Sequence, residues 1–268
     1  MHLADAQYGK KRKRKDVKKD KIKAKWNASE FEIAKRKELL TLFKNSPIID
    51  DELLMNISLY IKRQDISMML FMNELYKKIL NVHGVVVEFG VRWGRNLALL
   101  SSLRSIYEPF NHNRKIVGFD TFKGFLSVDK KDGAAKIITK GAYSVTDNYE
   151  QYLTKVLDCH EQLSPISHIK KYQLVKGDAS LEIKKYFKNN PETIIALAYF
   201  DFDIYQPTKK CLEALKPHLT KGSVIGFDEL NVHDYPGETV AFREVFGLGR
   251  YKIEHTLFSP TQSFLVVE

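Results

Sequence analysis

The chain has 268 residues, of which 44% are hydrophobic and 12% aromatic, a composition typical of one large α/β domain with its own core. No apolar stretch approaches the roughly 20 residues that span a bilayer, and the polar, basic N-terminus does not resemble a signal peptide. Only Cys159 and Cys211 occur, which excludes a disulfide framework and a cysteine metal knuckle. We therefore expect a cytoplasmic protein without a membrane span.

The formal net charge is +10, and much of the excess lies in one run between Lys10 and Lys25. Such a block is typical of a solvated, disordered arm, and it lacks the interleaved aromatic residues of a single-strand binding platform. We assign residues 1–27 to a basic arm and do not expect nucleic acid as a partner. An RNA-modifying enzyme guided by this arm remains an alternative.

Residues 28–82 are predicted to form a helical N-terminal extension. Ser29 can cap a first helix whose apolar residues recur up to Phe43, and Asp50 and Asp65 open a second and a third amphipathic helix. The apolar stripes of these helices must be covered. We therefore expect a homodimer that forms through the N-terminal helices.

Residues 83–268 alternate between short apolar runs and amphipathic stretches, and form the predicted catalytic domain. Strands are expected at 85–88, 115–120, 173–175, 194–200, 223–227, 251–254 and 264–267, and helices at 96–107, 149–157, 181–187, 208–215 and 239–246. Repeated strand–helix units of this length predict a three-layer, Rossmann-like α/β fold with a mostly parallel sheet.

The stretch from Phe122 to Tyr149 is long, glycine-containing and charged, which is typical of a lid over a site, or else of a surface excursion. Its lysines would attract an anionic acceptor such as a phosphorylated or nucleotide-linked sugar. They stand at positions 123, 130, 131, 136 and 140.

Two apolar runs end in acid, the first at Asp201 and Asp203 and the second at Asp228 and Glu229. Because the carboxyl ends of parallel strands meet at one rim, the four carboxylates are expected to converge there. Such a cluster needs a divalent cation or a shared proton to offset the repulsion, and an all-oxygen set favours Mg²⁺. His233 lies just beyond and could assist proton transfer, unless it is a loop histidine in solvent.

The opposite half of the rim carries the pattern of a cofactor site. Gly90 and Gly94 follow the first strand and allow a tight turn, Asp120 ends the second strand and can accept the hydroxyls of a ribose, and Asp178 ends the third. Only two of the three glycines of a dinucleotide motif are present, which argues against NAD. S-adenosylmethionine is favoured because its aminoacyl ammonium needs an acid near the first turn, such as Glu88, and its ribose needs Asp120. The expected cofactor contacts are Glu88, Gly90, Arg92, Gly94, Asn96, Asp120, Thr121, Phe122, Gly177, Asp178 and Asp201.

The order of these motifs resembles the macrocin O-methyltransferase (TylF-type) family over roughly residues 84–268. The motifs are Glu-x-Gly-x-x-x-Gly at 88–94, Phe119-Asp120-Thr121-Phe122-x-Gly124-Phe125, Asp201-x-Asp203-x-Tyr205-x-x-Thr208, Leu219-x-x-Gly222 and Asp228-Glu229. The resemblance implies the class I methyltransferase fold, with a seven-stranded sheet whose last strand is antiparallel. It also implies S-adenosylmethionine-dependent methylation of a hydroxyl, commonly on a sugar of a natural product.

Matched position by position, the resemblance implies Asp201, Asp228 and Glu229 as Mg²⁺ ligands and Asp203 as the base. Such a metal would lower the pKa of the acceptor hydroxyl, and the carboxylate would take its proton. The chain departs from the family pattern at Glu229, where an aspartate is usual, and at Gln206-Pro207-Thr208, which replaces Glu-Ser-Thr. A catechol-type O-methyltransferase has similar acidic placement and stays open as an alternative.

Overall fold

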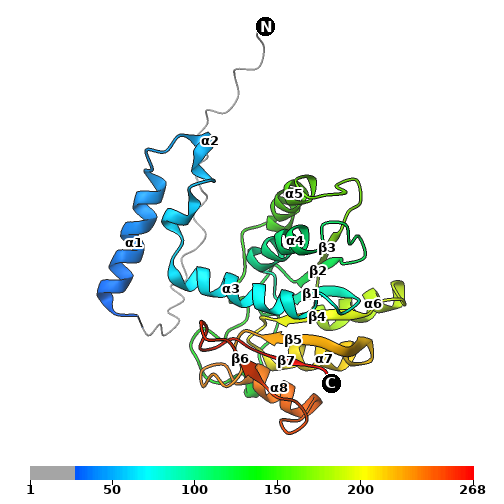
Figure 1. Ribbon diagram of the computed structural model, residues 1–268. Coiled ribbons are helices and arrows are strands. Elements are labelled where there is room, and N and C mark those ends of the chain that lie inside the picture. The colour runs from blue at the N-terminus through cyan, green and yellow to red at the C-terminus, as the bar shows by residue number, and fades with distance from the viewer. Residues whose placement is uncertain (1–27) are drawn as a thin grey trace.

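The computed structural model describes residues 28–268, and a seven-stranded sheet forms its middle layer (Figure 1). In spatial order the strands are β3 (Tyr172–Lys176), β2 (Ile116–Asp120), β1 (Val85–Phe89), β4 (Ile195–Phe200), β5 (Leu219–Phe227), β7 (Ser263–Val266) and β6 (Glu254–His255). The first five strands are parallel, whereas β7 runs antiparallel to β5 and to β6. This arrangement confirms the predicted fold class, including the reversed last strand.

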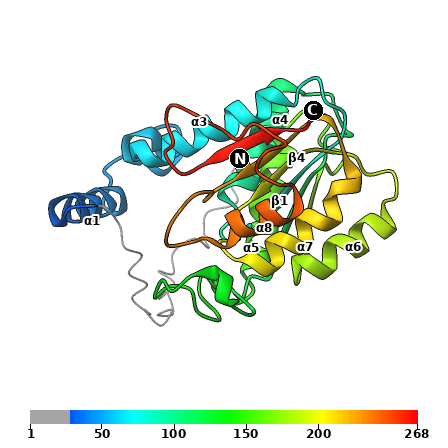
Figure 2. The same cartoon turned by 90° about the horizontal axis from the view of Figure 1, so that it is seen from below.

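Helices cover both faces of the sheet, as Figure 2 shows. One face carries α3 (Arg63–Lys78), α4 (Arg95–Tyr107) and α5 (Tyr149–Gln162), and the other carries α6 (Ala179–Asn189), α7 (Tyr205–Leu215) and α8 (Gly237–Val245). Phe71 and Leu75 of α3 are fully buried in the first core, and Leu212 and Phe242 are fully buried in the second. The sheet is thus buried on both sides, which explains why β1 and β4 read as continuous apolar runs.

The register of the central strands places the ends of β1, β4 and β5 side by side at one edge of the sheet. Phe89 of β1 lies opposite Phe200 of β4, and Phe200 lies opposite Phe227 of β5. The three chains therefore leave the sheet side by side, and the amide of Asp228 donates to the carbonyl of Phe200 at 2.9 Å. The loops that follow these strands start at the same edge.

The N-terminal helices differ from one another in their packing. Helix α1 (Glu30–Lys44) starts at Ser29, whose Oγ accepts from the amide of Glu32 at 3.2 Å as predicted, but none of its residues is buried and it projects from the sheet (Figure 1). The predicted second helix is wrong: the structure has a short α2 (Asp50–Leu53) and a 3₁₀ turn η1 (Ile57–Tyr60). Asn56 lies between them, and both its backbone amide and its side-chain amide donate to the carbonyl of Glu52, at 3.2 and 3.0 Å.

Some element boundaries also differ from the prediction. Helix α7 begins at Tyr205 rather than Thr208, because Pro207 stands in the first turn, where a missing amide hydrogen costs nothing. The strand expected at 251–254 is reduced to β6, and the ring of Tyr251 packs on Phe246 instead, 5.7 Å away. Two further 3₁₀ turns are η2 (Lys130–Asp132) and η3 (Lys216–His218).

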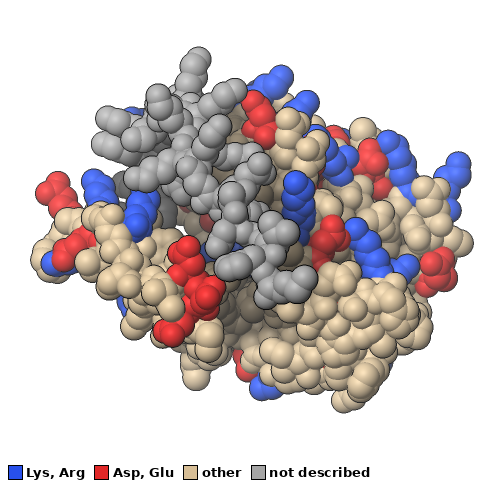
Figure 3. All heavy atoms as spheres, turned by 90° about the horizontal axis from the view of Figure 1, so that it is seen from above, with Lys and Arg blue, Asp and Glu red and all other residues tan. Residues whose placement is uncertain are grey.

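The surface shows no single basic face on the side seen in Figure 3, where Lys and Arg lie interspersed with Asp and Glu. The basic run predicted to form an arm lies outside the described residues. Within residues 28–268, none of the helices is both long and apolar enough to cross a lipid bilayer. Cys159 and Cys211 are both free thiols.

Candidate active site

The turn after β1 packs directly against the backbone at the end of β4. Gly90 has a φ of +95°, and a Cβ at this position would lie 2.0 Å from the carbonyl oxygen of Asp201. Gly94 has a φ of +79°, and its Cβ would lie 2.3 Å from Leu153 of α5. Gly90 is therefore required both by its contact with backbone and by its positive φ, whereas Gly94 is required mainly by its positive φ.

Asp120 ties together two turns of the expected cofactor pocket. Its Oδ2 accepts from the amide of Arg92 at 2.7 Å and its Oδ1 accepts from the amide of Phe122 at 2.5 Å. Arg92 and Phe122 have φ values of +48° and +55°, a region that costs energy for residues other than glycine. Burial raises the pKa of Asp120. Thr121 is used within the second turn, where its hydroxyl donates to the carbonyl of Gly124 at 2.9 Å.

Glu88 is buried at the end of β1, and Asn96 in the first turn of α4 forms a hydrogen bond with it. The Oε2 atom of Glu88 has no hydrogen-bond partner among the described residues. Burial, with a smaller contribution from the charge of Asp120, raises the pKa of Glu88 to about 8. A buried carboxylate oxygen without a partner is costly unless a ligand satisfies it, and an ammonium group fits this position chemically.

Asp178 caps α6, with its Oδ1 accepting from the amide and the hydroxyl of Ser180 at 2.9 and 2.6 Å. Gly177 has a φ of +149°, and its amide donates to the carbonyl of Asp120 at 2.9 Å. The ends of β2 and β3 are thereby joined beside the turn after β1. The second carboxylate oxygen of Asp178 takes no part in the cap.

The structure brings the four predicted carboxylates together at the ends of β4 and β5. Burial, then the charges of Asp228 and Asp203, raise the pKa of Asp201 well above its ordinary value. Burial and the charge of Asp228 raise the pKa of Asp203 to about 7, and burial and Asp203 raise that of Glu229 to about 11. Asp203 and Glu229 share a hydrogen bond, so a shared proton offsets part of the repulsion in this arrangement.

The chemistry of this donor set fits a divalent cation such as Mg²⁺. All the donors are carboxylate oxygens, they repel one another, and the Oε2 atom of Glu229 is buried without a hydrogen-bond partner. Within residues 28–268, however, no group of three or more histidine, cysteine or acidic side chains is arranged as a ready metal site.

Several residues that the sequence did not reveal surround the acidic cluster. The Oδ1 atom of Asp228 accepts from the hydroxyl of Tyr199 and from the amide of Gln262, both at 2.7 Å. Tyr143 donates to Asp203, and its hydroxyl lies 3.4 Å from that of Tyr235. The single tyrosine hydroxyl in an otherwise apolar strand was a usable signal for Tyr199, whereas nothing in the pattern marked Tyr143.

Arg92 connects the cofactor end to the acidic end. Its guanidinium lies 4.7 Å from the centre of the Tyr143 ring, and its charge lowers the pKa of Asp203. His233, in contrast, is exposed in the loop between β5 and α8, and among the described residues no hydrogen bond joins it to the cluster. His233, a predicted catalytic residue, is therefore not part of the acidic cluster.

The segment predicted as a lid is tied to the start of α7. Oδ1 of Asp132 accepts from the amide of Tyr205 at 2.6 Å, and Phe125 packs with Ile204 in a small buried cluster. Lys131, one of the five lysines expected to attract an anionic acceptor, is paired with Glu244 of α8 at 2.7 Å. Tyr143 brings this segment into contact with the acidic cluster, and its role as a lid stays a prediction.

Comparison with known proteins supports an enzyme with this site. No protein-family model and no curated protein sequence matches the chain. The crystal structure of the calicheamicin methyltransferase CalS11 matches with a TM-score of 0.88 and 42% identity, covering 90% of this chain and 94% of that one. The apo structure of CalS11, described as a TDP-rhamnose 3'-O-methyltransferase of calicheamicin biosynthesis, matches with a TM-score of 0.80 and 40% identity, covering 90% and 96% of the two chains.

The O-methyltransferase NovP is a more distant match, with a TM-score of 0.54 and 16% identity, covering 75% of this chain and 80% of that one. This likeness shows the shared fold alone. The match to CalS11 spans nearly the whole length of both chains and is consistent with the macrocin-type resemblance of the motifs. The chain therefore belongs to the CalS11 family of class I S-adenosylmethionine-dependent O-methyltransferases.

Proposed function

We propose that the chain transfers the methyl group of S-adenosylmethionine to a hydroxyl of a sugar with the help of Mg²⁺. The observation that carries this proposal is the cluster of four mutually repelling carboxylates at the ends of β4 and β5, directly beside the turn after β1. The relative described as a TDP-rhamnose 3'-O-methyltransferase supports a nucleotide-linked sugar as the acceptor class.

We assign the cofactor to the ends of β1, β2 and β3. The unpartnered oxygen of Glu88 would accept the aminoacyl ammonium, Asp120 the ribose hydroxyls, and the free oxygen of Asp178 the adenine amino group. Bound S-adenosylmethionine supplies an electrophilic methyl group on its sulfonium. Arg92, Gly94 and Asn96 shape this end of the site from the first turn of α4 and the loop before it.

We assign the acceptor to the acidic end. Asp201, Asp228 and Glu229 would hold Mg²⁺, which when bound lowers the pKa of an acceptor hydroxyl. Asp203 would accept the proton of that hydroxyl, and its hydrogen bond with Glu229 places it beside the proposed metal ligands. Tyr143 from the lid segment would orient the acceptor, and His233 takes no step in this scheme.

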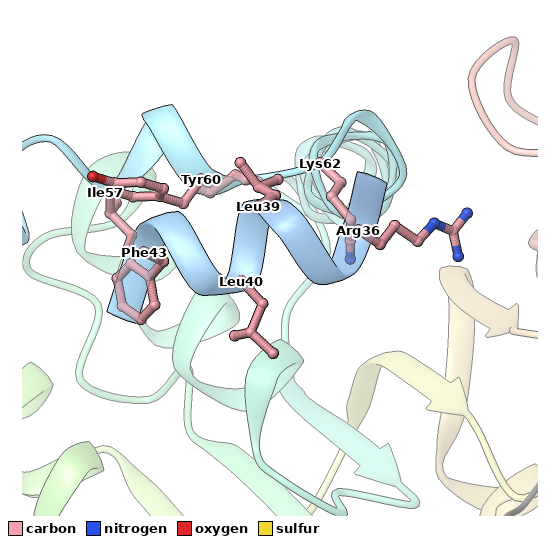
Figure 4. Close-up of a pocket in the computed structure, with 8 residues that line it drawn as sticks. Arg36, Leu39, Leu40, Phe43, Ile57, Tyr60 and Lys62 are labelled. Carbon is pink, nitrogen blue, oxygen red and sulfur yellow. The ribbon is translucent and has the colours of Figure 1, made fainter. Parts of the chain in front are cut away.

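A second copy of the chain is the occupant that we propose for the exposed face of α1. Leu40 and Phe43 of α1, with Ile57 and Tyr60 of η1, line a groove of about 380 Å³ (Figure 4). A helix without a buried residue is marginal by itself, so the face needs a partner. The first turn of α1 is acidic and its last turn ends in Lys44, so two copies in antiparallel order are complementary in charge.

The function is tested with purified protein, S-adenosylmethionine and three acceptors: TDP-rhamnose, catechol and RNA. We expect methylated TDP-rhamnose by mass spectrometry, loss of product with EDTA, and recovery with Mg²⁺. Asp203→Asn should lower kcat by about a hundredfold or more, whereas the exposed Asp147→Asn should leave it unchanged. Methylation of catechol or RNA alone contradicts the sugar assignment, and full activity in EDTA contradicts the role of Mg²⁺.

A further inference from the structure

Glu238 lies beneath the acidic cluster, in the first turn of α8, and none of its surface is exposed. Its Oε1 atom accepts from the backbone amides of Phe202 and Asp203 at 3.0 and 3.3 Å. Its Oε2 atom accepts from the backbone amide of Glu229 at 3.4 Å. One carboxylate thus joins the loop after β4 to the loop after β5, and these two loops carry all four acids of the cluster.

The helix that carries Glu238 is pressed against the same loops. A Cβ at Gly237 would lie 2.6 Å from the amide nitrogen of Tyr205 and 3.0 Å from the carbonyl oxygen of Asp203, so only glycine fits. On the other side of Glu238, the hydroxyl of Thr239 accepts from the amide of Asn231 at 2.8 Å. The first turn of α8 therefore contacts both loops at three consecutive residues.

The backbone of Asp203 needs such support. Its φ of +62° is in the left-handed region, which costs energy for a residue with a side chain and persists when surrounding contacts hold it. The hydrogen bond to Glu238 is made by the amide of Asp203 itself, directly at the unusual dihedral angle. A change in this φ would shift the carboxylate of Asp203 relative to Glu229 and Tyr143, with which it forms hydrogen bonds.

We propose that Glu238 is a positioning residue for the methyl transfer, which fixes the placement of Asp203 relative to Glu229. Its link to catalysis rests on the proposed role of Asp203 as base, whereas the bridge between the loops does not. A glutamate is required because both of its oxygens accept hydrogen bonds. A glutamine offers one acceptor, so its amide group would face a backbone N–H of one of the two loops.

Hydrogen exchange measured by mass spectrometry tests the bridge without any acceptor or metal. In Glu238→Gln we expect exchange about tenfold faster in peptides that contain residues 201–204 and 228–231, and unchanged exchange in peptides that contain residues 85–94. Glu213→Gln, an exposed glutamate on α7, is the matched control. Unchanged exchange in both loops overturns the proposal, and so does a uniform increase over the whole chain.

Kinetics with TDP-rhamnose test the consequence for the reaction. Glu238→Gln should lower kcat about tenfold or more while the KM for S-adenosylmethionine stays within about twofold, because a displaced base slows transfer without disturbing the cofactor. Glu238→Asp, which keeps both acceptors on a shorter arm, should recover part of kcat. An equal loss of kcat in both variants with unchanged exchange overturns the proposal. Faster loop exchange in a chain whose wild type does not methylate TDP-rhamnose supports the bridge and contradicts the proposed function instead.

Discussion

The hydroxyl of Tyr199 lies 2.7 Å from Oδ1 of Asp228, and this contact links the buried core to the acidic rim. Tyr199 is fully buried in β4, and its ring lies 6.2 Å from that of Phe71 on α3. Burial, with the charge of Asp228, raises the pKa of Tyr199, so the hydroxyl keeps its proton and donates a hydrogen bond to Asp228. The orientation of a proposed metal ligand therefore depends on a residue of the core.

Replacing Tyr199 with phenylalanine removes that donor and leaves Gln262 as the remaining side-chain donor to this oxygen of Asp228. We expect the free energy of unfolding in urea to fall by about 1–3 kcal/mol, and kcat to fall about tenfold. Tyr186→Phe, a buried tyrosine of α6 hydrogen-bonded to Thr193, is the control, and should leave kcat unchanged. Equal kcat values for the two variants would contradict a role of Tyr199 in the site.

Gly90→Ala should disrupt the cofactor end. The new methyl group would lie 2.0 Å from the carbonyl oxygen of Asp201 and would force a φ of +95° on alanine. We expect a loss of about 2 kcal/mol or more in stability and at least tenfold weaker binding of S-adenosylmethionine in calorimetry. Gly249→Ala meets no atom within 4 Å and should match the wild type in both measurements. Wild-type cofactor affinity in Gly90→Ala would refute the placement of this site.

Glu88 should make the stability of the ligand-free protein depend on pH. Burial raises its pKa from 4.5 to about 8, so the folded chain holds this proton more tightly than the unfolded chain. Its contribution to stability is full below pH 4.5 and is lost as the pH rises through about 8. The melting temperature should fall over this range, and Glu88→Gln should flatten the fall, whereas Glu213→Gln should not. If the melting temperature falls equally steeply with pH in Glu88→Gln and in wild type, Glu88 is not a source of the pH dependence.

Glu244 should hold the lid segment in place. Lys131 and Lys209 lie 2.7 and 2.8 Å from its two oxygens, and the hydroxyl of Tyr205 donates to it at 2.6 Å. Glu244→Gln should speed limited proteolysis between residues 123 and 147 severalfold at low salt, with a smaller difference at high salt because ions screen exposed pairs. Glu213→Gln should be cut like the wild type. Equal cleavage of Glu244→Gln and wild type would show that the ion pairs are dispensable.

The exposed face of α1 should control the oligomeric state. Leu40 lines the groove and is 51% exposed, so Leu40→Glu places a charge where a second copy would pack. We expect the wild type to be a dimer by light scattering after gel filtration and Leu40→Glu to be a monomer at micromolar concentration. Lys37→Glu, an exposed change on the same helix, should stay dimeric. A monomeric wild type would refute the dimer.

Local sequence patterns were sufficient to predict the sheet and the position of the acidic residues at its edge. The apolar runs that end at Asp201 and Asp228 had to be strands buried on both faces, and parallel strands bring their carboxyl ends to one edge whatever the loops do. The same reasoning placed Gly90 at a tight turn and Asp120 beside it. These conclusions needed only the strand period and the order of the elements.

Only the tertiary structure decided which groups satisfy those acids. Tyr143, between β2 and α5, donates to Asp203, and Gln262, near the C-terminus, donates to Asp228, while His233, close to the cluster in sequence, remains exposed. The hydrogen-bond partner of a buried polar group often comes from a segment far away in sequence. Loops lack the periodic pattern that predicts side-chain directions in helices and strands, so the sequence does not show where a loop side chain lies. The positions of the strand ends could therefore be predicted from the sequence, whereas the partners of their carboxylates depended on how the segment around Tyr143 and the loop that carries Gln262 pack against the sheet.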